Sequence, residues 1–317
     1  GYLRFLRGIV DSEDLPLNVS REMLQQNPIL ARIRQAIVKR VLSDLAAKAK
    51  DAPGEYAAFW ENFGAVLKEG IYEDAEQREK ILSLSRFRST HGEGLVSLDD
   101  YLGRMKDGQD AIYTIAGDDA AALAKSPQLE GFKARGVEVL LLSDPVDDFW
   151  LGIQPKFKDK PFRSVTRGAA DLDRIMGAEQ PKESGDDGPS DAQVGTLIAL
   201  IKQTLGAAVK NVRVSTRLID SPVCLVADEG DMDMHLARVL KQHRQLSSEA
   251  PRILEINPRH ALIRRLCELA VKPGAADNLA DAAHLLLDQA RILEGEPPPD
   301  AAAFARRLSD ALAKGLA

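Results

Sequence analysis

The sequence predicts an α+β fold in three successive parts: a helical segment, a small α/β sandwich subdomain, and an α+β domain that ends in a helical hairpin. Apolar residues recur at helical spacing in the first and last parts, whereas short strand-like runs alternate with helical segments between about 85 and 170. The run GAEQPKESGDDGPS at 177–190 has no apolar anchor, which is typical of a linker between domains.

The overall composition excludes several classes of function. The chain has 317 residues, 44% hydrophobic and 28% charged, which suits about two domains of ordinary soluble composition. Its net charge of −6 provides no general attraction to nucleic acid. No apolar run approaches the roughly 20 residues that cross a bilayer, and Cys224 and Cys267 match no metal or redox spacing. We therefore expect a cytoplasmic protein with neither a nucleic-acid partner nor a membrane partner.

Residues 1–84 are predicted to be helical. After Pro28, apolar residues recur every three or four positions, which is typical of a helix that faces a core. The Pro53-Gly54 pair interrupts this pattern, and further helices follow to Leu84. We expect this part to be the helical end of a larger subdomain. The main apolar positions of the first stripe are Ile29, Ile33, Ile37, Val41 and Leu45.

Residues 85–176 alternate between strands and helices, which predicts the small α/β sandwich. Ser97 and Asp100 have the spacing of a helix-capping box. A short helix is also expected through Phe149 and Trp150. Strands are expected at 87–90, 111–115, 137–142 and 162–165, with helices at 118–125 and 128–135.

Residues 191–317 form the last predicted domain. A helix at 191–205 precedes strands at 211–215, 223–227 and 253–256, and helices follow at 258–270, 278–293 and 300–316. The last two helices have long apolar stripes that must be covered either by their own domain or by a partner, and the pattern does not decide between these. The stripes include Leu279, Leu286, Leu287, Phe304, Leu308 and Leu312.

The loop RGIVDSEDLPLNVSREMLQ at residues 7–25 places an arginine in an unusual position. Pro16 stiffens the loop, and Asn18 and Ser20 are good helix N-caps. Arg21 would then lie in the first helical turn, where the helix dipole disfavours a cation unless an anion approaches it. A pair with nearby acidic side chains is the simpler alternative.

The run RGIVDSEDLPLNVSREMLQQN closely resembles the catalytic loop in the middle domain of the ninety-kilodalton heat-shock chaperone family, in its bacterial form. The resemblance implies that Arg21 reaches the γ-phosphate of ATP and that Gln25 supports it. It also implies that a separate N-terminal domain, absent from this chain, holds the ATP and is a partner of this chain. These residues would then be the end of a middle domain followed by a C-terminal dimerisation domain.

The remaining residues supply no complete active site. The chain has no glycine-rich phosphate-binding motif, and its five histidines lack metal-ligand spacing. We therefore expect no metal and no cofactor in this chain, and no ATP hydrolysis by it alone.

Two short apolar segments fit either a core or a surface that binds other proteins. The first is Asp148-Phe149-Trp150. The second is an apolar stripe at helical spacing, made of Met232, Leu236, Val239 and Leu240. The resemblance implies that both segments contact client polypeptides. In the first segment the family has a tryptophan where this chain has Phe149, so the sequence leaves open whether the ring of Phe149 or that of Trp150 faces outward.

The resemblance also implies that the two terminal helices form a four-helix interface with those of a second copy. The expected function is that of an ATP-dependent molecular chaperone that binds and remodels client proteins, to which this chain contributes an arginine, client surface and a homodimer interface. The alternative is a stand-alone dimeric adaptor module without ATP-coupled activity.

Overall fold

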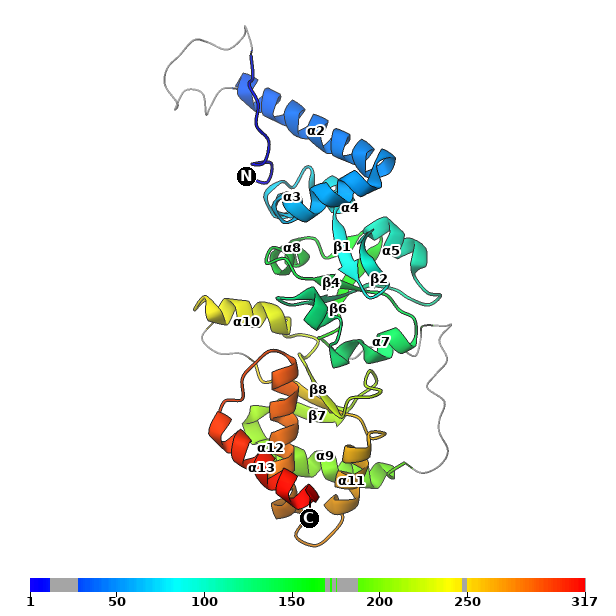
Figure 1. Ribbon diagram of the computed structural model, residues 1–317, viewed down its shortest axis with the longest axis vertical. Helices are drawn as coiled ribbons and strands as arrows, with labels where there is room; N and C mark the ends of the chain where they lie inside the picture. Colours follow the sequence, from blue (N-terminus) through cyan, green and yellow to red (C-terminus); the bar gives the residue numbers. More distant parts are fainter. Residues whose placement is uncertain (12–27, 169–171, 173–174, 176–187, 247–249, 317) are drawn as a thin grey trace. The chain divides into compact units, whose positions relative to one another are not determined.

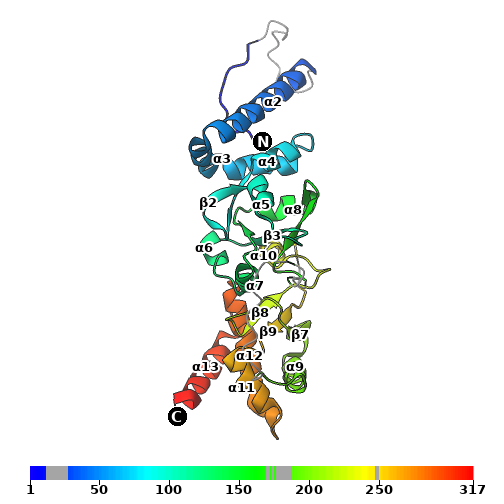
Figure 2. The same ribbon diagram turned by 90° about the vertical axis from the view of Figure 1, so that its right-hand side faces the viewer.

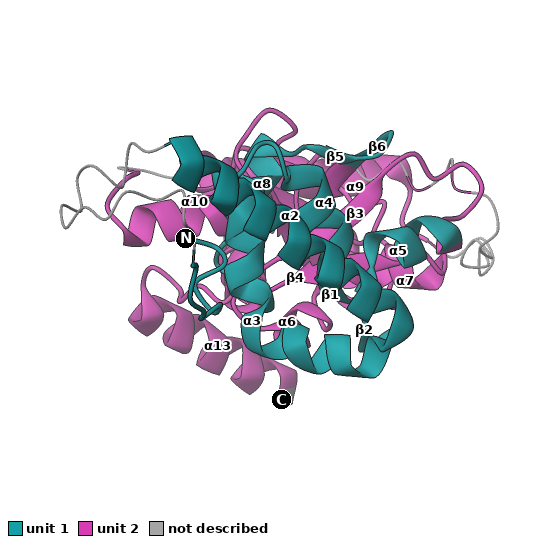
Figure 3. Ribbon diagram, turned by 90° about the horizontal axis from the view of Figure 1, so that it is seen from above, with its two compact units in different colours: residues 1–88, 92–103, 144–161 teal, residues 89–91, 104–143, 162–317 magenta. Residues whose placement is uncertain are grey.

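The computed structural model describes residues 1–11, 28–168, 172, 175, 188–246 and 250–316. They form two compact units, coloured separately in Figure 3. The first comprises Gly1–Arg88, Gly92–Gly103 and Asp144–Pro161, and the second comprises Ser89–His91, Arg104–Ser143 and Phe162–Ala317. Both units combine helices and strands, which confirms the predicted α+β class. The predicted domain limits at 84, 176 and 190 remain predictions.

The first unit is mainly helical. Its strand β5 (Lys156–Phe157) pairs in antiparallel fashion with Lys160 and Pro161 at the start of β6 (Lys160–Ser164). The predicted capping box at Ser97 is confirmed, because the Asp100 amide donates to Ser97 Oγ at 3.1 Å and the Ser97 amide donates to Asp100 Oδ2 at 3.2 Å. Apart from the last residues of β1 and α5, the unit contains α2 (Pro28–Asp51), α3 (Pro53–Glu73), α4 (Arg78–Leu84), β1 (Arg86–Ser89), β2 (Gly92–Ser97), α5 (Leu98–Arg104), α8 (Asp147–Ile153) and β5 (Lys156–Phe157).

The apolar stripe of α2 differs from the prediction of a core-facing helix. Leu42 and Leu45 near its C-terminal end are buried, but Ile37 is 40% exposed and Ile33 is half-buried. The N-terminal half of the helix instead lines an open groove together with residues 1–10, among them Leu6. The periodicity correctly predicted the helix, but it did not show how much of the stripe is covered.

The second unit begins with a small parallel sheet. Strand β3 (Ile112–Ala116) pairs in parallel with β4 (Val139–Leu142) on one side and with Phe162–Ser164 of β6 on the other. All four residues of β4 are buried, as predicted from its continuous apolar run. The helical segments of this part are α6 (Ala120–Leu123), η1 (Pro127–Leu129) and α7 (Glu130–Ala134).

The rest of the second unit is built around a three-stranded sheet (Figures 1 and 2). Its strands lie in the order β7 (Asn211–Val214), β9 (Ile253–Ile256), β8 (Val223–Val226). Buried side chains of α9, α11 and α12 form one hydrophobic core with this sheet. Ser190 and Gln193 form a capping box at the start of α9. The elements are α9 (Asp191–Leu205), η3 (Gly206–Ala208), β7 (Asn211–Val214), β8 (Val223–Val226), α10 (Met234–Gln242), β9 (Ile253–Ile256), α11 (Ala261–Ala270), α12 (Ala275–Leu293) and α13 (Ala301–Leu316).

Polar side chains, two of them fully buried, join the two parts of the second unit. The Glu130 carboxylate in α7 accepts hydrogen bonds from the backbone amides of residues 219, 220 and 221, at 2.7, 2.8 and 3.2 Å. Arg217, which is fully buried, donates to the carbonyl oxygen of Gly168 at 2.6 Å and to Glu255 Oε2 at 3.0 Å. Gln128, also fully buried, donates to the Leu225 carbonyl oxygen at 2.6 Å. Because buried polar groups need partners, these contacts fix the two parts against each other.

Among the described residues, no helix combines the length and the apolar character that a membrane-spanning helix requires.

Candidate functional site

The two residues predicted to act on ATP, Arg21 and Gln25, lie outside the described residues, in the segment 12–27. Their predicted roles therefore remain predictions. The structure describes the other candidate residues, on α8, on and just before α10, and on the two terminal helices.

A buried ionic cluster fixes the orientation of α8 in the first unit. Lys68 of α3 is almost fully buried, and its Nζ lies 2.7 and 2.9 Å from the two carboxylate oxygens of Asp147 and 2.6 Å from Asp144 Oδ2. The indole Nε1 of Trp150 donates to Asp147 Oδ1 at 2.7 Å. Buried charges are tolerated only when they are paired and hydrogen-bonded, as they are here. The cluster therefore determines which side of α8 faces inward.

The opposite side of α8 carries exposed apolar residues. Phe149 is 45% exposed and Ile153, four residues later on the same helical face, is 37% exposed. Trp150 is fully buried and Asp148 is 7% exposed. Of the two rings that the sequence left open, Phe149 is thus the outward one. Asp148 and Trp150 help to build the helix, and Phe149 is the residue of the three that another protein could contact.

We expect Trp150→Phe to reduce the free energy of unfolding by about 1–3 kcal/mol, because the buried Asp147 carboxylate loses a hydrogen-bond donor. Urea unfolding followed by circular dichroism measures this change. Phe149→Ser is the matched control, since a change on the exposed side should stay within about 0.5 kcal/mol. A Trp150→Phe protein as stable as the wild type would show that the Trp150–Asp147 bond adds nothing.

The second candidate surface, α10, begins later than the apolar stripe predicts. Asp233 is its N-cap and accepts from the His235 amide at 2.9 Å, so the helix starts at Met234. Met232 lies before the helix and is 41% exposed. Met234, which the sequence analysis did not select, is buried and packs in the hydrophobic core. Three residues of the predicted stripe remain on the helix and are half-buried: Leu236, Val239 and Leu240.

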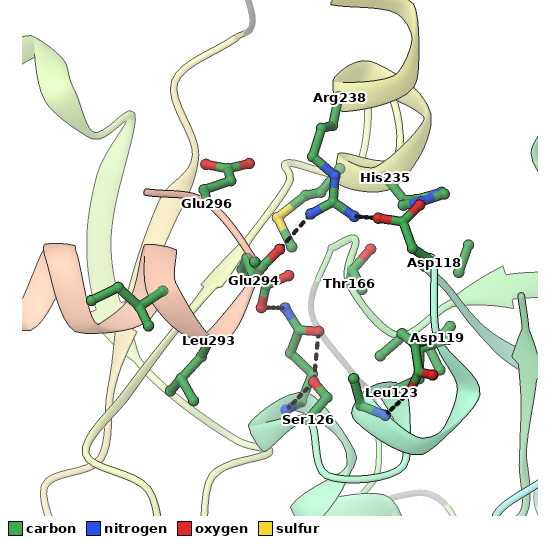
Figure 4. A pocket seen from close by; sticks show the side chains of 18 of the residues that line it. Asp118, Asp119, Leu123, Ser126, Thr166, His235, Arg238, Leu293, Glu294 and Glu296 are labelled. Carbon is green, nitrogen blue, oxygen red and sulfur yellow. Dashed lines mark hydrogen bonds and ion pairs between the residues drawn. The ribbon is translucent and has the colours of Figure 1, made fainter. Parts of the chain in front are cut away.

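Polar side chains hold α10 in place (Figure 4). Asp233 Oδ2 accepts from Ser164 Oγ at 2.5 Å and from Thr166 Oγ1 at 2.8 Å. His235 Nε2 lies 3.1 Å from Asp118 Oδ1, which follows β3. This hydrogen bond, and to a lesser degree the nearby Arg238, lowers the pKa of the Asp118 carboxyl. The start of α10 is therefore attached at two points to the small parallel sheet.

Arg238, one turn further along α10, points between two acceptors. Its NH2 group lies 3.4 Å from Asp118 Oδ2, and its NH1 group donates to the backbone carbonyl oxygen of Glu294, at the C-terminal end of α12. The Glu294 side chain accepts from Gln128 Nε2 at 2.9 Å, and burial raises the pKa of its carboxyl to about 7. These residues line a pocket of about 290 Å³ beside α10. The described residues contain no group of side chains suited to hold a metal ion.

The terminal helices divide the predicted interface residues into two sets. Leu279, Leu286 and Leu287 of α12 are 2–3% exposed and pack in the core of their own chain. On α13, Leu308 is 40% and Leu312 is 57% exposed, while Phe304 is half-buried. Ile292 and Leu293 at the end of α12, which sequence reasoning did not select, are also exposed, at 46% and 48%. The surface available to a partner is therefore on α13 and the last turn of α12.

Comparison with known proteins places the chain in a family. The family model described as "Hsp90 protein" matches residues 1–317, and the chain therefore belongs to the Hsp90 chaperone family. The resemblance inferred from the loop at 7–25 is thus confirmed for the whole chain.

The chain is similar to the chaperone protein HtpG of several bacteria. It is 60% identical to that of Paramagnetospirillum magneticum and 57% identical to that of Roseobacter denitrificans, over 99% of this chain and 51% of each relative. Identity to the HtpG of Rhodospirillum rubrum is 56%, over 99% of this chain and 50% of the relative. The chain thus spans about half the length of the curated relatives that it matches.

Proposed function

We propose that this chain is the part of an ATP-dependent, cytoplasmic, homodimeric chaperone that binds client polypeptides and forms the dimer. ATP would be held by a part of the full-length protein outside these residues, and Arg21, supported by Gln25, would contact its γ-phosphate. The observation that carries the client-binding proposal is the exposure of Phe149 on a helix that a buried ionic cluster holds rigidly.

A fixed apolar surface of this kind suits an unfolded polypeptide as its partner. An unfolded client exposes apolar side chains, and a fixed apolar surface can cover them without a large cost of ordering itself. Phe149 and Ile153 provide such a surface on α8. The half-buried Leu236, Val239 and Leu240 on α10, with the flexible thioether of Met232 before it, provide a second.

We expect Phe149→Ser in the full-length protein to weaken the binding of an unfolded reporter protein about three- to tenfold. Phe149 is 45% exposed, and burial of that part of the side chain contributes about 0.7–1.4 kcal/mol. Fluorescence anisotropy of a labelled, permanently unfolded reporter measures the affinity. Tyr72→Ser is the matched control, because Tyr72 belongs to the same unit and is 57% exposed.

Equal affinities for the Phe149→Ser protein and the wild type would contradict the proposal for α8. An equal loss in the Tyr72→Ser control would show that the reporter senses general surface hydrophobicity, and would contradict it as well.

A further inference from the structure

The helix α10 has few apolar contacts to hold it. It is nine residues long, and an isolated helix of this length is unstable in water. Met234, in its first turn, is its one buried apolar side chain among the residues described. The residues after it on the apolar side, from Leu236 to Leu240, are half-buried. The direction of the helix beyond its first turn therefore depends on polar contacts.

Those polar contacts differ in how far they are shielded from water. The Asp118 side chain is 81% exposed, so its ion pairs with His235 and Arg238 are weak. The Arg238 side chain is 19% exposed, and its hydrogen bond to the Glu294 carbonyl oxygen is partly buried. A charged donor in a partly buried site makes a stronger bond than an exposed ion pair. The stronger contact of Arg238 is therefore the one to α12.

The acceptor itself suits a cation. Glu294 is the C-cap of α12, where the last carbonyl groups of a helix lack donors within the helix and the helix dipole is negative. Arginine at such an end satisfies a free carbonyl and interacts favourably with the dipole. Gln128 holds the side chain of the same residue, so the acceptor is fixed on both sides.

We propose that Arg238 is a positioning residue that fixes the apolar face of α10 for client contact by tying the helix to the C-terminal end of α12. This inference rests on the proposed client role of α10. Figure 4 shows this contact between Arg238 and Glu294. Because α13 is the next helix after α12 along the chain, the contact joins the proposed client surface to the part of the chain that forms the proposed dimer interface. Asp118 assists from the other side with an exposed and weaker contact.

Hydrogen exchange of the full-length protein without any client tests the positioning role directly. In Arg238→Gln, the amides in the second half of α10 should exchange about tenfold faster, since one hydrogen bond with a charged donor is lost. The amides of β8 and β9 should be unchanged. Arg238→Lys should give an intermediate rate, because its ammonium group can still donate to one acceptor. Arg259→Gln, at an exposed arginine between β9 and α11, makes the same change of charge and should have no effect on α10.

Affinity for the unfolded reporter separates this inference from the proposed function. Arg238→Gln should weaken binding several-fold, with partial recovery in Arg238→Lys. Leu236→Ser combined with Leu240→Ser tests whether α10 contacts clients at all. If the leucine variant binds normally, the client role of α10 fails while the exchange result stands. If the leucine variant binds weakly but Arg238→Gln changes neither exchange nor affinity, or changes exchange alone, the inference about Arg238 is overturned.

Discussion

Replacing Arg21 by alanine in the full-length protein should lower the rate of ATP hydrolysis by about 10³–10⁵-fold, the range seen for arginines that contact a transferring phosphoryl group. The guanidinium would be a fixed positive charge at the place where negative charge develops in the transition state. Because the gain arises mainly in the transition state, the affinity for ATP should remain close to that of the wild type. A coupled steady-state ATPase assay and a nucleotide-binding titration measure the two quantities separately.

Two further variants sharpen this test. Arg21→Lys should recover little activity, since lysine lacks the forked donor geometry of arginine. Arg32→Ala removes an exposed arginine of α2 and serves as the control for a general change of charge. A normal ATPase rate in Arg21→Ala would remove the catalytic role. A loss of ATP affinity with an unchanged rate at saturating ATP would instead show an effect on ground-state binding.

The second large effect is expected at the dimer interface. Replacing Leu308 and Leu312 together by serine should weaken dimerisation by about 10³-fold. In a two-fold symmetric interface each substitution occurs twice, so four half-exposed leucines are lost, at about 1 kcal/mol each. This sum of about 4 kcal/mol corresponds to a factor of about 10³ in the dissociation constant. Sedimentation velocity over a concentration series measures it.

Substitution of a core leucine of α12 should affect folding before it affects dimerisation. Leu286→Ala should destabilise the folded unit by about 2–5 kcal/mol, as a cavity in a packed core does, so its effect would appear first in the unfolding transition. Val271→Ser alters an exposed apolar residue at the end of α11 and should leave dimerisation unchanged. A wild-type protein that stays monomeric at micromolar concentration, or a Leu308/Leu312 variant that dimerises normally, would contradict the proposed interface.

The terminal helices show why sequence pattern predicts an element better than it predicts what the element touches. Both α12 and α13 have the apolar spacing of an amphipathic helix, and both were predicted within a few residues of their ends. The same spacing arises whether the stripe is covered by the chain itself or by a second copy. Only the packing in three dimensions separates the buried Leu286 from the exposed Leu312.

The sequence did not show fully which residues of α8 and α10 are exposed, and the physical cause differs between the two helices. Neighbouring helical residues point about 100° apart, so the side on which Phe149 and Trp150 lie depends on the contact with Lys68, which precedes Asp147 by 79 residues. Such a distant pairing leaves no local signal. For α10 there was a local signal, because Asp233 is a good N-cap residue and would have moved the helix start past Met232.

The contacts of Glu130, Arg217 and Gln128 hold the two parts of the second unit together in addition to the covalent chain that links them. These side chains connect the small parallel sheet to the three-stranded sheet without using residues 176–187. A chain cut within that segment would therefore lose covalent continuity but keep the polar contacts that hold its two pieces together. In this respect the second unit resembles a complex of two proteins that happen to be encoded in one polypeptide.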